Sequence, residues 1–246
     1  MRDVVRRGAL ALALALSAAG LPAPAAAEFT EEEIKRLALE AILENPQIVL
    51  DAVAILRQRE AEAAAAAQRE LLSEQRMLLE RDPNAPVVGN PEGSVTVVEF
   101  MDYNCPYCKR AAGEVAALLD GDGDIRVVYR EWPILGEGSV YAARAALAAR
   151  RQGKYPQMHE RLMGLRGRVD EAAVLRVARE IGLDIEQLQA DMQAPEIDEH
   201  LETSRWLAEQ LGFSGTPSFV IGDALAPGFV ELEQLQSMVA AARAAE

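Results

Sequence analysis

The residues best suited to chemistry in this 246-residue chain are its only two cysteines, Cys105 and Cys108, in the run Cys-Pro-Tyr-Cys. A disulfide between them would close a very short loop, so it could add little to the stability of a domain of this size. The spacing is instead typical of a redox-active pair that alternates between two thiols and a disulfide. We therefore expect a reactive role for the pair.

The flanking sequence predicts how the two thiols are positioned. Residues 95–101, which are mostly apolar, are expected to form a buried strand, and a helix is expected to run from Cys105 to about residue 119. Backbone N–H groups and the dipole at a helix N-terminus stabilise a thiolate, so Cys105 is predicted to be the exposed, attacking thiol. Pro106 suits the first helical position. Cys108, on the same helix face, is predicted to be more buried and to resolve the mixed disulfide.

Metal binding is the main alternative for such a pair. A structural zinc site needs four ligands, and the two histidines, His159 and His200, are far from the cysteines and from each other in sequence. We therefore expect neither a metal nor a cofactor at the pair, and we expect both histidines to be surface or core residues. A Cu(I)-binding protein that uses the two soft thiolates remains an alternative function of another class.

The order of the surrounding elements predicts an α/β fold. A second strand at residues 125–130 would complete a β-α-β unit with two parallel strands. Residues 139–212 have helical periodicity throughout and are predicted to form a helical block. Two short strands and a terminal helix follow, at residues 218–222, 225–226 and 231–245.

The first 27 residues form a separate unit of composition. Three arginines precede an apolar run at residues 9–16, and three alanines end the unit at residues 25–27. This layout predicts a secretory signal peptide, with the mature chain starting at Glu28 in an oxidising compartment outside the cytosol. The apolar run is shorter than the roughly 20 residues that span a bilayer, although an uncleaved anchor is the alternative.

Residues 28–80 are predicted to form a helical segment. Thr30 and Glu33 make a capping-box pattern, and Asn45-Pro46 separates a first helix from a second that extends to about residue 80. The segment cannot bury its apolar stripe alone, so it either packs on the remainder of the chain or self-associates; we favour self-association. Residues 81–93, with three prolines and two glycines, are predicted to be a linker.

The net charge excludes one class of partner. The chain has 39 acidic and 25 basic residues, a formal charge of −14. Such a surface repels phosphate backbones, so we expect no nucleic-acid partner. Ordinary solubility accounts for the charge.

Two motifs give the chain a family resemblance. The run F-x-D-Y-x-C-P-Y-C-K-R and the later run G-T-P-S-F-V-I-G resemble the DsbA-like branch of the thioredoxin superfamily, over residues 94–246. The resemblance implies a thioredoxin fold interrupted by a helical domain, and thiol–disulfide exchange in the periplasm. The partners would be unfolded or misoxidised secreted proteins and a membrane protein that resets the cysteines. It also implies that Pro217 is cis rather than a trans turn proline, and that Thr216 and Pro217 face the cysteines and pair with substrate.

Glu99 matches the buried acid that many members of this family place beneath the cysteines. An acidic residue inside an apolar strand is costly unless it is exposed or functional. We expect Glu99 to shuttle protons for Cys108, the alternative being a solvent-facing side chain.

The N-terminal segment carries a second, shorter resemblance. Three glutamates followed by Ile34, and then Asn45-Pro46, resemble the leader of the suppressor-of-copper-sensitivity C (ScsC) family. Several such periplasmic proteins trimerise through this leader and act as isomerases or reductases in copper tolerance, which implies a homotrimer here. Pro106 and Tyr107 are expected to contact substrate. Because Tyr107 replaces the histidine of the strong oxidant DsbA, the pair should be less oxidising. The isomerase or reductase is thus favoured over a monomeric DsbA-type oxidase.

Overall fold

The computed structural model describes residues 29–245, so the predicted signal peptide lies outside the described residues. The chain divides into two compact units between Arg59 and Glu60. In the first unit, helix α1 (Glu31–Glu44) begins with the predicted capping box: the Thr30 hydroxyl accepts from the Glu33 N–H, and the Glu33 carboxylate accepts from the Thr30 N–H. All described residues of this unit are exposed, including its apolar side chains.

Helix α2 (Gln47–Arg81) runs from the first unit into the second. Its C-terminal part belongs to the core of the second unit, where Leu72 and Leu79 are buried. Residues 60–80, which the sequence grouped with the N-terminal segment, are therefore needed to complete this core.

The second unit contains a five-stranded sheet in the order β1-β3-β2-β4-β5. Strands β2 (Val95–Met101) and β3 (Ile125–Glu131) are parallel, as predicted for the β-α-β unit. Strand β4 (Ser218–Ile221) pairs antiparallel with β2, and β5 (Ala224–Pro227) pairs antiparallel with β4.

A short strand within the predicted linker was not expected. Strand β1 (Val87–Gly89) pairs antiparallel with β3 and forms one edge of the sheet. Three residues are too few to show an alternating pattern, which is why the sequence signal is absent. Gly89 has a φ of 77°, and a Cβ there would stand 2.7 Å from the Ile125 carbonyl oxygen, so this close approach requires glycine.

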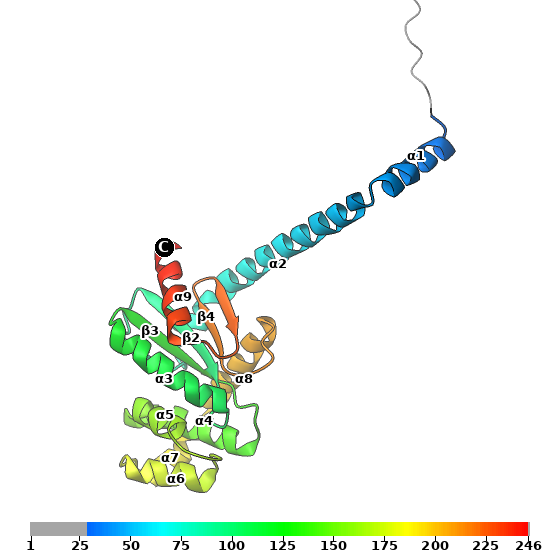
Figure 1. Ribbon diagram of the computed structural model, residues 1–246. Helices are drawn as coiled ribbons and strands as arrows, with labels where there is room; N and C mark the ends of the chain where they lie inside the picture. Colours follow the sequence, from blue (N-terminus) through cyan, green and yellow to red (C-terminus); the bar gives the residue numbers. More distant parts are fainter. Residues whose placement is uncertain (1–28, 246) are drawn as a thin grey trace, which may run out of the picture. The chain divides into compact units, whose positions relative to one another are not determined.

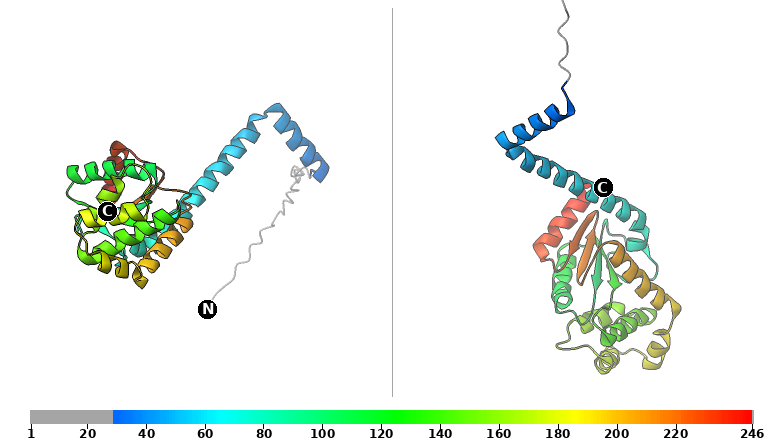
Figure 2. Two further views of the ribbon diagram at one scale, coloured as in Figure 1. Left: turned by 90° about the horizontal axis from the view of Figure 1, so that it is seen from below. Right: turned by 90° about the vertical axis from the view of Figure 1, so that its right-hand side faces the viewer.

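Helices cover both faces of the sheet (Figures 1 and 2). On one face lie α3 (Pro106–Gly121) and α9 (Leu232–Ala245), which pack on alternate residues of β2 and β3 such as Val97 and Val127. On the other face lie the C-terminal part of α2 and helix α8 (Pro195–Gln210), which pack on Val98, Phe100 and Val128. The alternation of strand side chains thus divides the core into two layers.

A helical block is inserted between β3 and β4, which confirms the predicted thioredoxin fold with a helical insertion. Five α-helices and one 3₁₀ helix make up the block: α4 (Glu137–Ala149), η1 (Arg150–Gln152), α5 (Tyr155–Met163), α6 (Glu171–Glu180), α7 (Ile185–Asp191) and α8 (Pro195–Gln210). Helix α4 lies at its centre and is rich in buried alanines, whose small side chains let neighbouring helices approach closely.

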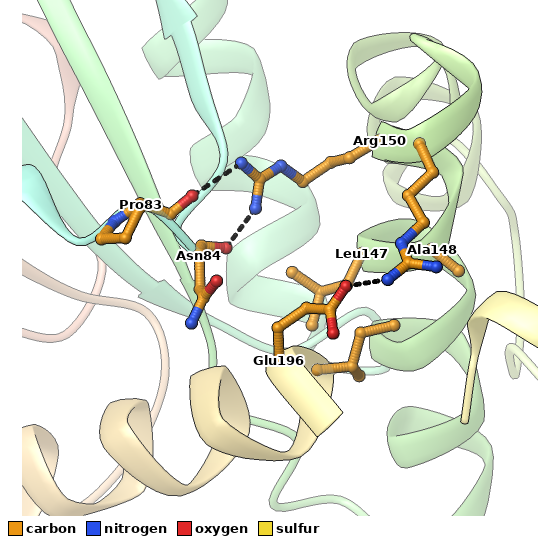
Figure 3. Close-up of a pocket in the computed structure, with 8 residues that line it drawn as sticks. Pro83, Asn84, Leu147, Ala148, Arg150 and Glu196 are labelled. Atoms are coloured by element: carbon orange, nitrogen blue, oxygen red, sulfur yellow. Dashed lines mark hydrogen bonds and ion pairs between the residues drawn. The ribbon is translucent and has the colours of Figure 1, made fainter. Parts of the chain in front are cut away.

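Arg150 joins this insertion to the segment after α2, and Arg151 joins η1 to α8 within the insertion (Figure 3). The Arg150 guanidinium donates to the backbone carbonyls of Pro83 and Asn84, while Arg151 pairs with Glu196. These residues line a pocket of about 290 Å³. Both guanidinium groups in this pocket already bind protein groups. We therefore assign the pocket a structural role.

Candidate active site

Cys105 and Cys108 lie at the N-terminus of α3, directly after the carboxyl end of β2. Cys105 is the N-cap residue, and Pro106 occupies the first turn as predicted. Both cysteines are free thiols. Cys105 is 5% exposed and Cys108 is 0% exposed. The order of burial agrees with the prediction, but Cys105 is far less accessible than expected.

The segment before β4 covers Cys105. The Cys105 thiol donates to the backbone carbonyl of Thr216, with 3.1 Å between Sγ and O. The Thr216–Pro217 peptide bond is cis, as the family resemblance implied. Sequence reasoning placed these residues opposite the cysteines, but it could not show that their backbone would shield the sulfur.

The surroundings of Cys105 favour the thiolate. They lower its pKa from about 9 to about 5, chiefly because the Cys108 thiol donates a hydrogen bond to the Cys105 sulfur. Burial opposes this shift, while the backbone N–H groups of Cys108 and Tyr107 and the side chain of Thr216 add to it. Cys105 is therefore predominantly ionised at neutral pH, as a nucleophilic thiol requires.

Cys108 has the opposite electrostatic balance. Burial raises the pKa of its thiol well above the ordinary value, and its hydrogen bond to Cys105 and the charge of Glu99 raise it further. A weak hydrogen bond from the Asp102 N–H, 3.5 Å from the sulfur, only partly offsets these effects. Cys108 therefore holds its proton until a base accepts it.

Glu99 is buried in β2 and is only 1% exposed, which excludes the solvent-facing alternative. Within residues 29–245, neither of its carboxylate oxygens has a hydrogen-bond partner. Burial, and then the negative charge of Cys105, raise its pKa from 4.5 to about 8. A buried carboxyl with a pKa near neutrality is suited to proton transfer.

Asp102 is a positioning residue that sequence reasoning missed. Its buried carboxylate accepts from four donors: the N–H groups of Asn104, Ile134 and Leu135, at 2.7, 2.8 and 2.9 Å, and the Ser139 hydroxyl at 2.7 Å. It therefore fastens the turn before Cys105 to the start of the helical insertion. The available signal was an acidic residue directly after a buried strand, within the quoted motif.

Aromatic side chains flank the cysteines on the outside. Tyr107 is 53% exposed. The guanidinium carbon of Arg110 lies 4.2 Å from the Phe229 ring centre and 5.8 Å from that of Tyr107. This cation–π stacking links Tyr107, in the first turn of α3, to Phe229 through the Arg110 guanidinium.

The two histidines lie in the protein core and do not join the cysteines. The Tyr103 hydroxyl contacts His159 Nδ1 at 3.2 Å, and burial lowers the His159 pKa to about 4. His200 Nε2 lies 2.8 Å from a carboxylate oxygen of Glu131. Within residues 29–245, no group of three or more His, Cys, Asp or Glu side chains could hold a metal ion.

The geometry is that of a thiol pair with one activated and one protected sulfur, next to a cis proline. Residues 96–240 match the family model of the DSBA-like thioredoxin domain. The chain belongs to the DsbA-like thioredoxin family. This family membership confirms the predicted enzyme class, a thiol–disulfide oxidoreductase.

Solved structures of this family resemble the chain closely. A thioredoxin-like oxidoreductase from Silicibacter pomeroyi DSS-3 is 65% identical, with a TM-score of 0.69 over 70% of this chain and 99% of that one. The thiol-disulfide exchange protein alpha-DsbA2 from Wolbachia pipientis is 30% identical, with a TM-score of 0.68 over 73% and 97%. A linker-deletion mutant of ScsC from Proteus mirabilis is 27% identical, with a TM-score of 0.68 over 90% and 100%.

Curated relatives include longer proteins of a different kind. The Na(+)/H(+) antiporter NhaA 1 from Salinispora arenicola is 34% identical over 65% of this chain. The DsbA-like chain spans about a quarter of the length of this relative, because the match covers 25% of it. In residues 29–245, we find no helix with the length and hydrophobicity needed to cross a membrane.

Proposed function

We propose that this DsbA-like protein is a periplasmic disulfide isomerase or reductase that acts on secreted proteins, with Cys105 as the attacking thiol and Cys108 as the resolving thiol. The observation that carries the assignment of roles is the contrast between the two sulfurs. Cys105 has a pKa of about 5, whereas the Cys108 pKa is raised by burial. Only Cys105 is ionised at neutral pH.

The reaction begins when the Cys105 thiolate attacks one sulfur of a client disulfide. The client S–S bond breaks, a mixed disulfide forms, and the other client sulfur leaves as a thiolate. If another client thiolate then attacks the client sulfur of the mixed disulfide, Cys105 is released and the client disulfide is rearranged. If Cys108 attacks Cys105 instead, the client is reduced and a Cys105–Cys108 disulfide remains for a membrane redox partner to reduce.

Glu99 supports the second route. The Cys105 charge contributes to the raised Glu99 pKa, and this charge disappears when Cys105 enters the mixed disulfide. The Glu99 pKa then falls, so that its carboxylate becomes available to accept the proton of Cys108. The smaller of the two causes of the raised Glu99 pKa is thus removed at the step that requires a base, while burial, the larger cause, remains.

The first unit supports isomerase action. Ile34, Leu37, Val49, Val53 and Leu56 are exposed on α1 and the start of α2. Such a run of apolar side chains favours burial against copies of the same chain, and we propose a homotrimer. An oligomer presents several active sites to one misoxidised client, which suits rearrangement. The similarity to ScsC over 90% of the chain supports this proposal.

A monomeric DsbA-type oxidase is the second candidate. The low pKa of Cys105 stabilises the reduced pair, which makes the disulfide form a better oxidant. Tyr107 is predicted to have the opposite effect, because a tyrosine in place of the histidine of DsbA should make the pair less oxidising. The oligomeric state and the measured reduction potential separate the two candidates.

The test is refolding of scrambled ribonuclease by the chain that starts at Glu28 and by a variant that starts at Glu60. The second start point retains Leu72 and Leu79 in the core, whereas a start after residue 80 would remove them. We expect the shorter variant to be monomeric, to keep its dithiol reductase activity and to lose isomerase activity. Equal isomerisation by both would contradict the proposed role of the first unit. Tight Cu(I) binding without activity on scrambled disulfides would favour the copper-binding alternative.

A further inference from the structure

A cavity of about 850 Å³ lies beside the active-site motif. It is lined by Asn104, Pro106 and Lys109 of the motif and, among others, by Arg166 and Arg168 of the loop between α5 and α6. Pro106 directly follows the attacking thiol in sequence. A client chain that reacts with Cys105 therefore has this cavity as an immediate neighbour. We refer to it as the cationic cleft.

The motif itself holds the loop in place on both sides of the two cysteines. Lys109 Nζ donates to the backbone carbonyls of Leu165 and Gly167, at 2.7 and 3.1 Å. The Asn104 side chain donates to the Val169 carbonyl at 3.0 Å and accepts from the Val169 N–H at 2.7 Å. The position of the loop is therefore tied to the position of the redox pair.

The loop carries two unpaired positive charges. Arg166 and Arg168 are exposed and flank Gly167, whose φ of 80° is in the left-handed region. Neither arginine forms an ion pair or a side-chain hydrogen bond within residues 29–245. Other arginines of the insertion do have carboxylate partners: Arg144 pairs with Asp198, Arg151 with Asp191 and Glu196, and Arg161 with Glu180.

The two exposed arginines of this loop contrast with the strongly negative charge of the whole chain. With a formal charge of −14, the protein as a whole repels acidic clients. Two free guanidinium groups beside the attacking thiol provide a local exception. A guanidinium offers a planar set of N–H donors that matches a carboxylate, and Lys109 is committed to holding the loop that presents these groups.

We propose that the cationic cleft binds acidic side chains of client polypeptides, within a few residues of the client cysteine that reacts with Cys105. This inference rests on the proposed role of Cys105 as the attacking thiol. The cleft would select among clients by the sequence around the cysteine, through Arg166 and Arg168, with Lys109 and Asn104 as positioning residues.

Three peptides of equal length test the proposal. Each contains one cysteine as a mixed disulfide with the uncharged leaving group pyridine-2-thiol, flanked by glutamate, glutamine or lysine. The second-order rate constant of each reaction with the reduced chain from Glu28 is measured at low ionic strength. We expect the glutamate peptide to react about threefold faster than the glutamine peptide, or more, and the lysine peptide to react slowest. Added salt should reduce the differences.

Two double variants locate the effect. In R166Q/R168Q, the glutamate-to-glutamine rate ratio should fall towards one. R176Q/R179Q removes two exposed arginines of α6, which belongs to the same insertion, at positions that do not line the cleft. It changes the net charge equally and should keep the ratio. Circular dichroism of both variants verifies that the fold is intact.

The outcomes separate this inference from the proposed function. If the glutamate peptide reacts no faster than the glutamine peptide, or if R166Q/R168Q keeps the ratio, the cationic cleft has no role in client selection. If R166Q/R168Q slows only the reaction with glutathione disulfide, the cleft binds a small carboxylate-bearing thiol and the client assignment is wrong. If no peptide reacts, the proposed role of Cys105 fails as well.

Discussion

The sulfur of Cys105 lies 3.1 Å from the backbone carbonyl oxygen of Thr216, the residue before the cis proline. The thiol form of Cys105 can donate to this carbonyl, but the thiolate cannot. Ionisation of Cys105 therefore frees the Thr216 carbonyl to accept another hydrogen bond, and we propose that the backbone of a client supplies the donor. The closeness of this carbonyl contributes to the low exposure of Cys105, which is 5% exposed.

Removing the thiol of Cys108 should make Cys105 harder to ionise. The hydrogen bond from Cys108 is the largest cause of the low Cys105 pKa. A hydrogen bond to a charged group is worth about 1.5–3 kcal/mol, so Cys108→Ala should raise the pKa by about one to two units. The rate of Cys105 alkylation as a function of pH measures this rise in the Cys105 pKa. Cys108→Ser keeps a donor and is the control; an equal rise in both variants would refute this account.

Thr216 should contribute less to the same pKa. Its side chain also hydrogen-bonds the Cys105 sulfur, but it ranks below Cys108 among the causes of the low pKa. We expect Thr216→Val to raise the Cys105 pKa by less than about one unit, and Thr216→Ser to leave it near the parent value. The thiolate absorbance at 240 nm, measured as a function of pH, gives the Cys105 pKa of both variants. A rise larger than that in Cys108→Ala would show that the order of the two contributions is wrong.

Glu99 should make stability depend on pH. Its folded-state pKa is about 8, against 4.5 ordinarily, so between these values the unfolded state loses its proton while the folded state retains it. The Glu99 contribution to the free energy of unfolding therefore falls as the pH rises from about 4.5 to about 8, whereas the lowered Cys105 pKa of the reduced protein contributes a rise between about pH 5 and 9. Comparison of Glu99→Gln with the parent isolates the Glu99 contribution. Glu99→Gln removes this loss, on the order of a few kcal/mol at pH 8. Urea denaturation of the reduced proteins at both pH values measures the difference.

The exposed Glu92 provides the matched control for Glu99. Glu92→Gln should follow the parent protein at both pH values. If the proton-shuttle proposal is right, Glu99→Gln should also slow the resolving step and change its pH profile. An unchanged rate and profile in Glu99→Gln would remove Glu99 from the mechanism, even if the stability prediction holds.

Asp102→Ala should destabilise the fold and the motif together. The substitution leaves the buried Ser139 hydroxyl and the part-buried N–H groups of Asn104, Ile134 and Leu135 without their acceptor. We expect a loss of roughly 3–5 kcal/mol in the free energy of unfolding. Chemical denaturation checks this value, with Asp120→Ala as the exposed control. A loss below about 1 kcal/mol would show that water replaces the carboxylate without difficulty.

Local features were predicted well because they depend on neighbours in the sequence. The capping box at Thr30, the helix start at Cys105 and Pro106, and the parallel β-α-β unit all follow from short-range patterns. The helical block at residues 139–212 follows from its periodicity. The cis bond before Pro217 came from the family resemblance, since composition and periodicity alone do not specify a minority isomer.

Several features that join distant segments were not predicted, although the family resemblance did place Thr216 and Pro217 opposite the cysteines. Strand β1 is too short to show a pattern, and only its pairing with β3 makes it a strand. Asp102 gains its importance from donors more than 30 residues away, at Ile134, Leu135 and Ser139. The C-terminal part of α2 has a sequence like the rest of that helix, yet Leu72 and Leu79 are buried while Leu56 is exposed.

The sequence by itself determined that the chain carries a redox pair at a helix start, within a thioredoxin fold that has a helical insertion. Tertiary structure alone decided that the Thr216 backbone shields Cys105, that the buried Glu99 carboxylate has no hydrogen-bond partner among residues 29–245, and that the loop with Arg166 and Arg168 lies beside the motif. The reason is physical. Helix starts and strand periodicity are set by residues a few positions apart, whereas burial and pKa depend on which distant groups the folded chain brings together.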